Sequence, residues 1–165
     1  MPDVLNSNLN IVFCGMAAGN RSAAIRAYYA GHGNKFWRVL ADIGLTPELL
    51  QPLQFRSLLD FGIGLTDVAK YASGNDVDIS TADRDPGVVR AKILCYSSKI
   101  FAFNGKEAAA TFYSCKTCDI KYGLQGTRLG TTAIYVLPST SGAANGYWDA
   151  SYWVELAGVA RGFKS

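Results

Sequence analysis

Asn10-Ile11-Val12-Phe13-Cys14, followed by Gly15, is a short and almost continuously apolar run. A run that lacks the polar alternation of a half-exposed strand is typical of a strand buried on both faces in a parallel sheet. Three further strand-like stretches follow, at residues 64–68, 100–103 and 131–137. We therefore expect four buried strands, the last of which can pair with residues 126–129 through a hairpin.

Helix-like segments separate these strands. Asn34 precedes apolar residues at helical spacing and is placed to cap a helix, which Gly44 is placed to end. Asp85 and Pro86 are typical of the start of a helix, which we expect to run to about Ser97. Further helices are expected at residues 49–61 (with Leu53, Leu58 and Leu59 inward), 106–114 and 148–163, and surface loops at residues 19–22 and 70–85.

Strands and helices that alternate at this pitch indicate an α/β fold. We predict a three-layer sandwich, in which helices flank a central, mostly parallel sheet of four to five strands. The chain has 165 residues and no internal repeat or long linker, so we expect a single domain over residues 1–165.

Composition narrows the class of protein. Hydrophobic residues make up 49% of the chain and charged residues 18%, which is enough apolar material for a core and excludes a disordered chain. No apolar run approaches the roughly 20 residues of a membrane span, and residues 1–4 lack the features of a secretory signal, so we expect a cytoplasmic protein away from membranes. The formal net charge of +3 is compatible with a polyanionic partner but is too weak to indicate one.

The four cysteines form no recognisable set of metal ligands. Cys14 and Cys95 lie in apolar runs, and we expect both in the core. Cys115 and Cys118 form a C-x-x-C, which is found in redox-active pairs and in halves of metal sites. Because no second C-x-x-C exists, we interpret the pair as structural and predict no metal and no cofactor.

The candidate functional residues lie where the predicted strands end. In open parallel sheets, ligands bind beyond the carboxyl ends of the strands. The four ends to consider are residues 15–19, 66–67, 104–106 and 138–142. The first is rich in Gly and Ala, which lets a ligand approach backbone N–H groups closely, but it lacks the glycine patterns of nucleotide-phosphate loops. A plain tight turn is the alternative.

Three side chains near these ends suit contacts with a nucleobase. Tyr29 offers a ring that can stack on a base, and ordinary packing is the alternative. Asp67 can act as a general base or steady a cation, or it can cap a short helix. Asn104 offers a donor and an acceptor to a base edge, but because Lys106 starts a helix we favour a capping role. The loop at residues 138–146 is rich in hydroxyls and uncharged, which suits phosphate contacts or a small wedge.

Three motifs follow one another along the chain: VFCGMAAGNRSA at residues 12–23, YAGHGNKFW at residues 29–37 and VLPSTSG at residues 136–142. They resemble V-F-C-G-I-N-P-G-x-x-S-A, aromatic-A-x-x-x-N-[RK]-F-W and V-L-P-N-P-S-G of the mismatch-specific uracil/thymine-DNA glycosylase family, within the uracil-DNA glycosylase superfamily. The resemblance extends over residues 11–153 and implies an enzyme of base excision repair. Such an enzyme flips a deaminated base, uracil by default, out of DNA and hydrolyses its N-glycosidic bond, leaving an abasic site.

The first motif departs from the family pattern at Ala17. The family has an asparagine there that is credited with positioning the attacking water, and a methyl group cannot hold a water. The resemblance therefore implies either a weak enzyme or another residue in that role. Asp67 is our candidate for the substituted catalyst, because it is the only acidic residue directly at a predicted strand end. Asn20 and Asn104 are the alternates.

The remaining roles follow from the resemblance. Tyr29 is expected to stack on the base, Asn104 to read its edge, and the backbone N–H groups of Met16, Ala17 and Gly19 to hold its oxygens. DNA contacts are expected from Arg21, Ser22, Lys35, Ser139, Ser141, Gly142 and Asn145. The implied partner is uracil-containing DNA, double-stranded or single-stranded, bound by a monomer that acts on the bacterial nucleoid.

Two other functions stay open at this point. A lesion-DNA binding protein without turnover is consistent with the alanine at position 17. An enzyme acting on a small nucleotide or nucleoside could use the same strand ends. The preferred base is open as well, among uracil, thymine, hypoxanthine and xanthine.

Overall fold

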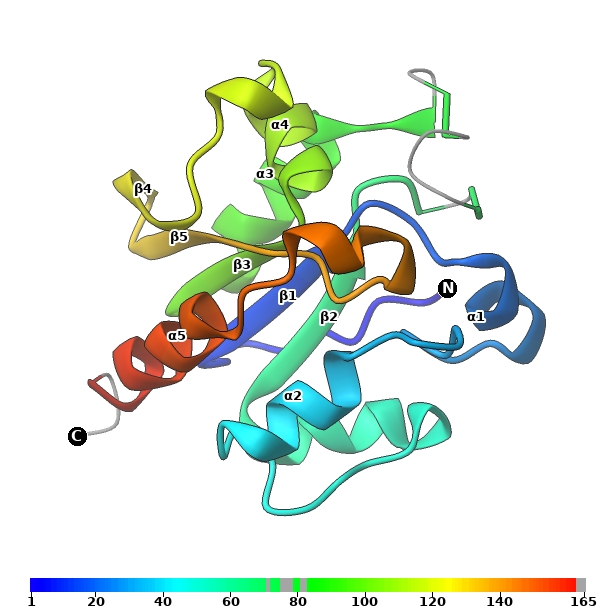
Figure 1. The fold of residues 1–165 in the computed structure, drawn as a ribbon. Helices are drawn as coiled ribbons and strands as arrows, with labels where there is room; N and C mark the ends of the chain where they lie inside the picture. Colours follow the sequence, from blue (N-terminus) through cyan, green and yellow to red (C-terminus); the bar gives the residue numbers. More distant parts are fainter. Residues whose placement is uncertain (71, 75–78, 81–82, 163–165) are drawn as a thin grey trace.

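A five-stranded sheet forms the middle layer of the protein (Figure 1). The computed structural model describes residues 1–70, 72–74, 79–80 and 83–162. The strands are β1 (Ile11–Gly15), β2 (Ile63–Asp67), β3 (Ile100–Asn104), β4 (Gly123–Leu129) and β5 (Thr132–Leu137). Their order is β2-β1-β3-β5-β4, with β4 antiparallel to β5 and all other neighbours parallel. The predicted α/β fold, its mostly parallel sheet and the hairpin are confirmed.

Helices cover both faces of the sheet, which gives the predicted three layers (Figure 1). On one face α2 (Phe36–Asp42), the 3-10 helix η1 (Pro52–Phe61) and α5 (Ala150–Gly162) pack around Phe13. On the other face α3 (Pro86–Tyr96) and α4 (Lys106–Tyr113) pack around Phe103. Three further helices of the described residues are short: α1 (Asn20–Ile25) and the 3-10 turns η4 (Thr117–Asp119) and η5 (Gly142–Tyr147).

The predicted start of α3 is confirmed, and that of α2 is off by one residue. Lys35 rather than Asn34 is in the cap position of α2, although the Asn34 side chain accepts a hydrogen bond from the backbone N–H of Phe36 at 3.0 Å. Gly44 follows the end of α2 with a φ of +78°. Asp85 caps α3 by accepting from the backbone N–H of Val88 at 3.1 Å. No helix within the described ranges is long and apolar enough to cross a membrane.

Three predictions about local structure were wrong. Residues 19–22 are not a loop, because α1 begins at Asn20. The segment from Pro52 is a 3-10 helix with three residues per turn, which buries Phe55 and Leu58 and leaves Leu53 70% exposed. Cys95 is exposed rather than in the core, since the inner face of α3 is the one that carries Val89 and Ile93. Cys14 is buried as predicted. Of the predicted surface loop, residues 71, 75–78 and 81–82 lie outside the described residues.

Candidate functional site

Three neighbouring strands end in Asp67, Gly15 and Asn104. Gly15 pairs with Asp67 across β1 and β2, and Asn104 directly follows the residue that pairs with Cys14. Alternate residues of a strand point to the same face, and the residues two positions before these three all belong to the core under α2 and α5. The three positions therefore form a row on that face, at the carboxyl edge of the sheet.

Gly15 carries no side chain, so side chains of other residues border the middle of this row. We call this position the Gly15 gap. A Cβ atom at Gly15 would lie 3.0 Å from Oδ1 of Asp67 and 3.2 Å from the hydroxyl oxygen of Tyr29. The Asp67 carboxylate, predicted from a strand end, and the Tyr29 side chain, predicted from the second motif, therefore converge on one point. The structure brings these two candidate residues together.

The Asp67 carboxyl is buried, with 4% of the residue exposed. Burial raises its pKa to about 6; the nearby Asp3 carboxylate also raises the pKa, and the Lys70 and Lys92 ammonium groups lower it. The alternative of a helix cap is wrong, because residues 68–70 are not helical. Asp67 is thus a buried carboxyl that titrates close to neutral pH, as is typical of a general base.

An ion cluster that the sequence did not indicate stands beside Asp67. The Asp3 carboxylate pairs with Lys70 at 2.5 Å and Lys92 at 2.7 Å, and accepts from the Thr66 hydroxyl at 2.7 Å. Burial would raise the pKa of Asp3, but these hydrogen bonds and charges outweigh it, and its pKa lies below the usual range. The cluster fastens the N-terminal segment to the end of β2, where Val4 bridges Leu65.

The turn before α2 aims Tyr29 at the gap. Tyr29 has a φ of +53°, a left-handed conformation that is strained for a bulky residue. Its ring packs on Phe36 with centroids 4.0 Å apart. The Ser22 hydroxyl, buried with the residue 3% exposed, accepts from the backbone N–H of Ala30 at 2.8 Å. This position favours a role for Ser22 in holding the turn and does not favour the expected contact with phosphate.

Asn104 holds the loop that follows β5. Its amide nitrogen donates to the Thr140 hydroxyl at 2.9 Å, and its oxygen accepts from the Thr140 backbone N–H at 3.0 Å. The favoured capping role was wrong, since Gly105 is the residue that precedes α4 in the cap position. An amide has a second N–H and a second acceptor site, so base reading by Asn104 stays a prediction.

Asn104→Ala is expected to lower the free energy of unfolding by about 1–2 kcal/mol, because two buried polar groups of Thr140 lose their partner. Urea unfolding monitored by circular dichroism measures this change. The matched control is Asn6→Ala, an exposed residue whose loss should cost under about 0.5 kcal/mol. Equal stabilities of the Asn104 and Asn6 variants would contradict the role of Asn104.

The loop after β5 packs against the segment before α2. The Lys35 backbone N–H donates to the Thr140 carbonyl at 2.9 Å, and the Lys35 ammonium donates to the side-chain oxygen of Asn145. A Cβ on Gly142 would lie only 3.2 Å from the His32 carbonyl oxygen, so the two segments are in close contact. The second and third motifs thus form one rim beside the row of strand ends.

The two serines of this loop shape it from inside. The Ser139 hydroxyl accepts from the backbone N–H of Ser141 at 3.2 Å, and the Ser141 hydroxyl accepts from that of Ala143 at 3.3 Å, where η5 begins. Each hydroxyl keeps a proton of its own to donate. Their phosphate contacts therefore stay predictions.

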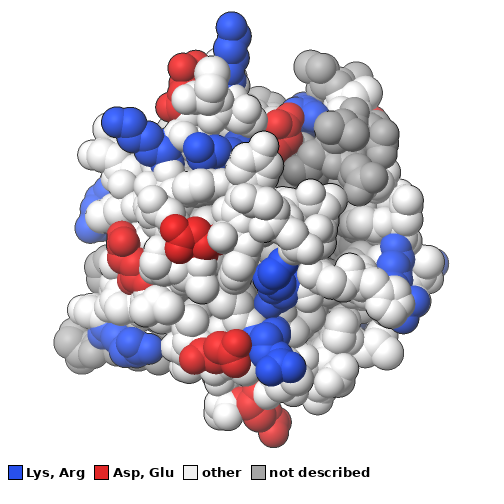
Figure 2. All heavy atoms as spheres, in the orientation of Figure 1, with Lys and Arg blue, Asp and Glu red and all other residues white. Residues whose placement is uncertain are grey.

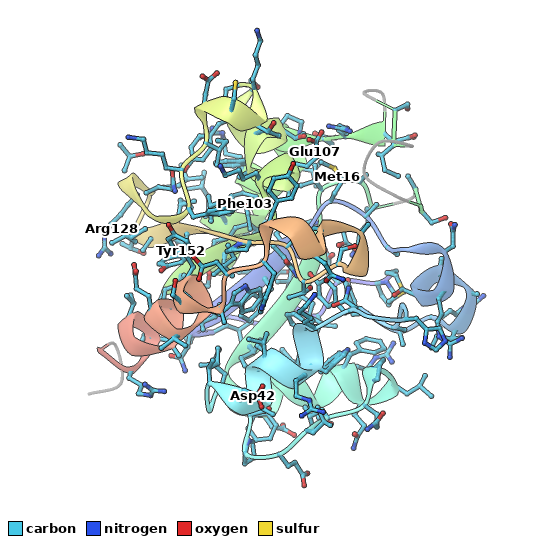
Figure 3. All side chains as sticks on the ribbon, in the orientation of Figure 1. Met16, Asp42, Phe103, Glu107, Arg128 and Tyr152 are labelled. Carbon is cyan, nitrogen blue, oxygen red and sulfur yellow. The ribbon has the colours of Figure 1, made fainter. Side chains whose placement is uncertain are left out.

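The residues after β1 line the rim less closely. Met16 is buried in the core of the α3 and α4 face, and Figure 3 shows it at the end of β1 toward α4, so only its backbone faces the site. Ala17 is half-buried, while Gly19, Asn20 and Arg21 are exposed at the start of α1. The exposure of Asn20 does not favour it as the catalyst.

Charge is spread thinly over the face that carries α2 and α5. Figure 2 shows Lys and Arg side chains interspersed with Asp and Glu there, rather than gathered into one basic field. Together with the net charge of +3, this gives the face shown only a weak attraction for a polyanion.

Two surface hollows lie away from this site. One of about 510 Å³ lies against α3 and α4 and is lined by residues that include Arg84, Glu107 and Cys115. The other, of about 540 Å³, lies at the opposite edge of the sheet, beside Asn10 and Gly62. Neither includes Asp67, Gly15 or Tyr29, so neither of these two hollows is part of the candidate site.

The fold and the site together describe an α/β protein with a buried carboxylate and an aromatic ring at the carboxyl edge of a parallel sheet. The chain belongs to the uracil DNA glycosylase superfamily, whose family model matches residues 2–157. A solution NMR structure of a proposed uracil DNA glycosylase from Methanosarcina acetivorans is similar, with a TM-score of 0.56 and 22% identity, covering 100% of this chain and 97% of the other. At that identity the likeness concerns the fold. The predicted superfamily is confirmed.

Proposed function

We propose that this chain is a monofunctional DNA glycosylase that flips a deaminated base, uracil first, out of DNA and hydrolyses its N-glycosidic bond to leave an abasic site. Membership of the uracil DNA glycosylase superfamily supports a DNA substrate with a uracil-like lesion. The three motifs support the mismatch-specific branch. The observation that carries the proposal is the buried Asp67 carboxylate at the Gly15 gap, opposite Tyr29.

Flipping the base out of the stack costs a few kcal/mol, and less at a mismatch, which favours mispaired uracil. As the C1′–N bond breaks, the base leaves with the bonding electrons and the sugar becomes positively charged. The Asp67 carboxylate offsets that charge and accepts a proton from the attacking water. With a pKa of about 6, this carboxyl is ionised in most molecules at neutral pH. Backbone N–H groups after β1 and the second N–H of Asn104 are our candidates for hydrogen bonds to the leaving base.

One assay tests the proposal. Labelled oligonucleotides that carry uracil, thymine, hypoxanthine or xanthine, single-stranded or opposite each base, are incubated with excess protein, and alkali then cleaves abasic sites. We expect strand breaks with uracil, fastest at a mismatch. Intact strands with all four bases would reject the glycosylase proposal.

A lesion-DNA binding protein without turnover is the second candidate, and the methyl group at Ala17 is the observation in its favour. Tight binding of uracil-containing DNA without abasic product after prolonged incubation would support it.

Ala17→Asn separates the two candidates further. If Asp67 supplies the catalytic carboxylate, an added amide at position 17 should change the single-turnover rate by less than about threefold. A gain above about tenfold would mean that the native site lacks its catalyst and that Asp67 does not replace it. Ala18→Asn, in the next half-buried position, is the matched control.

A further inference from the structure

The hydroxyl of Tyr29 lies closest to the Gly15 gap, with its oxygen 3.2 Å and the ring carbon Cε1 3.8 Å from the position of a Cβ on Gly15. Its oxygen and Oδ1 of Asp67 lie 3.2 and 3.0 Å from the same point, the position that a Cβ on Gly15 would occupy. The two oxygens are therefore at most about 6 Å apart, a span that one water molecule can bridge with hydrogen bonds of ordinary length. Both oxygens are buried, so such a water is shielded from bulk solvent.

The local structure fixes the direction of this hydroxyl. The left-handed backbone at Tyr29, the Ser22 hydrogen bond to the next residue and the ring contact with Phe36 all hold it in place. Strained backbone of this kind persists where the surrounding structure over-determines it, and such positions cluster at functional sites. Phe36 covers one face of the Tyr29 ring, and the hydroxyl at the end of the ring points to Gly15.

We propose that the Tyr29 hydroxyl and the Asp67 carboxylate act as a pair that holds the attacking water at the Gly15 gap, a role that rests on the proposed glycosylase function. The water oxygen attacks C1′ of the flipped nucleotide while the C1′–N bond breaks. The base leaves as an anion with the bonding electrons, and the water proton passes to Asp67. The Tyr29 hydroxyl orients the water through a hydrogen bond and keeps its own proton throughout.

Other charged and titratable groups act on Asp67 and are left unchanged in the test below. They are Asp3, Lys70, Lys92, Tyr28, Cys14 and the amino group of Met1. Lys70 and Lys92 are held by Asp3, so a change at Tyr29 that keeps the ring leaves their charges in place.

Tyr29→Phe tests the pair, because it removes the hydroxyl and keeps the ring. We expect the single-turnover rate with uracil-containing duplex to fall about tenfold or more, while the Kd for that duplex changes less than about twofold. The acid limb of the pH–rate profile should move to higher pH, since the water that donates to the carboxylate, and so favours its ionised form, loses its second partner. Tyr122→Phe, a half-buried tyrosine near β4, is the control and should leave both quantities unchanged.

Gly15→Ala provides a second test, since its methyl group would lie between the two oxygens while the strand backbone accepts alanine. If both changes disturb the same water, the double variant should lose about as much rate as the slower single variant. The two fold-losses should not multiply. If the parent excises uracil and Tyr29→Phe matches it in rate at every pH, the pair is rejected and the glycosylase stands. If the parent makes no abasic product, the glycosylase function is rejected together with the pair.

Discussion

Asp67→Asn is expected to lower single-turnover excision of uracil from duplex DNA by at least about tenfold, the lower range of what a general base contributes. The amide accepts no proton from water and carries no charge to offset that of the sugar. Asparagine has nearly the volume of aspartate, so the space beside Gly15 stays filled. Loss of rate without loss of structure is therefore the expected result.

Asp60→Asn is the matched control, because Asp60 is an exposed carboxylate on η1, outside the candidate site. It should excise uracil like the parent. The pH–rate profile adds a second criterion: the rate of the parent should rise as the pH increases through about 6 and then level off, and the residual rate of Asp67→Asn should lack this limb. An Asp67→Asn variant as active as the parent would remove Asp67 from the mechanism.

The fold was largely predictable because its strands are buried on both faces. Each residue of β1, β2, β3 and β5 is buried, and apolar runs of this kind have few other placements. Helix ends were predictable where a local signal exists, as at Asp85 and Pro86. The helix α1 was missed, because Gly19 and the polar residues after it are typical of a loop and six residues carry little periodicity.

The residues of the candidate site that lie at the carboxyl ends of strands could be predicted from the sequence. Asp67 and Asn104 end adjacent parts of a parallel sheet, so their places beside Gly15 follow from topology. The partners of these strand ends do not follow from topology, because Thr140 meets Asn104 across 36 residues of chain and Asp3 bonds Thr66, the neighbour of Asp67, across 63. Nothing near Asp3 in the sequence indicates that it binds Lys70 and Lys92, and only the folded chain brings these charges together.

Burial of the ionised Asp67 carboxylate should lower the free energy of unfolding at neutral pH. Asp67→Asn removes the charge and should therefore show how large this effect is. The native carboxyl has a pKa of about 6 against an ordinary value of 3.8, so the native state binds this proton more tightly than the unfolded state. The contribution of Asp67 to stability is thus complete below about pH 4 and is lost as the pH rises through about 6. The amide is neutral at every pH, like the protonated carboxyl.

Asp67→Asn is therefore expected to raise the free energy of unfolding by up to about 3 kcal/mol above pH 7, and by little near pH 4. Urea unfolding at the two pH values measures the difference. Asp60→Asn should change stability by less than about 0.5 kcal/mol at either pH. A variant that is destabilised equally at both pH values would contradict the raised pKa. A variant that is more stable at neutral pH and yet excises no uracil would separate the catalytic role of this carboxylate from any role in holding the fold.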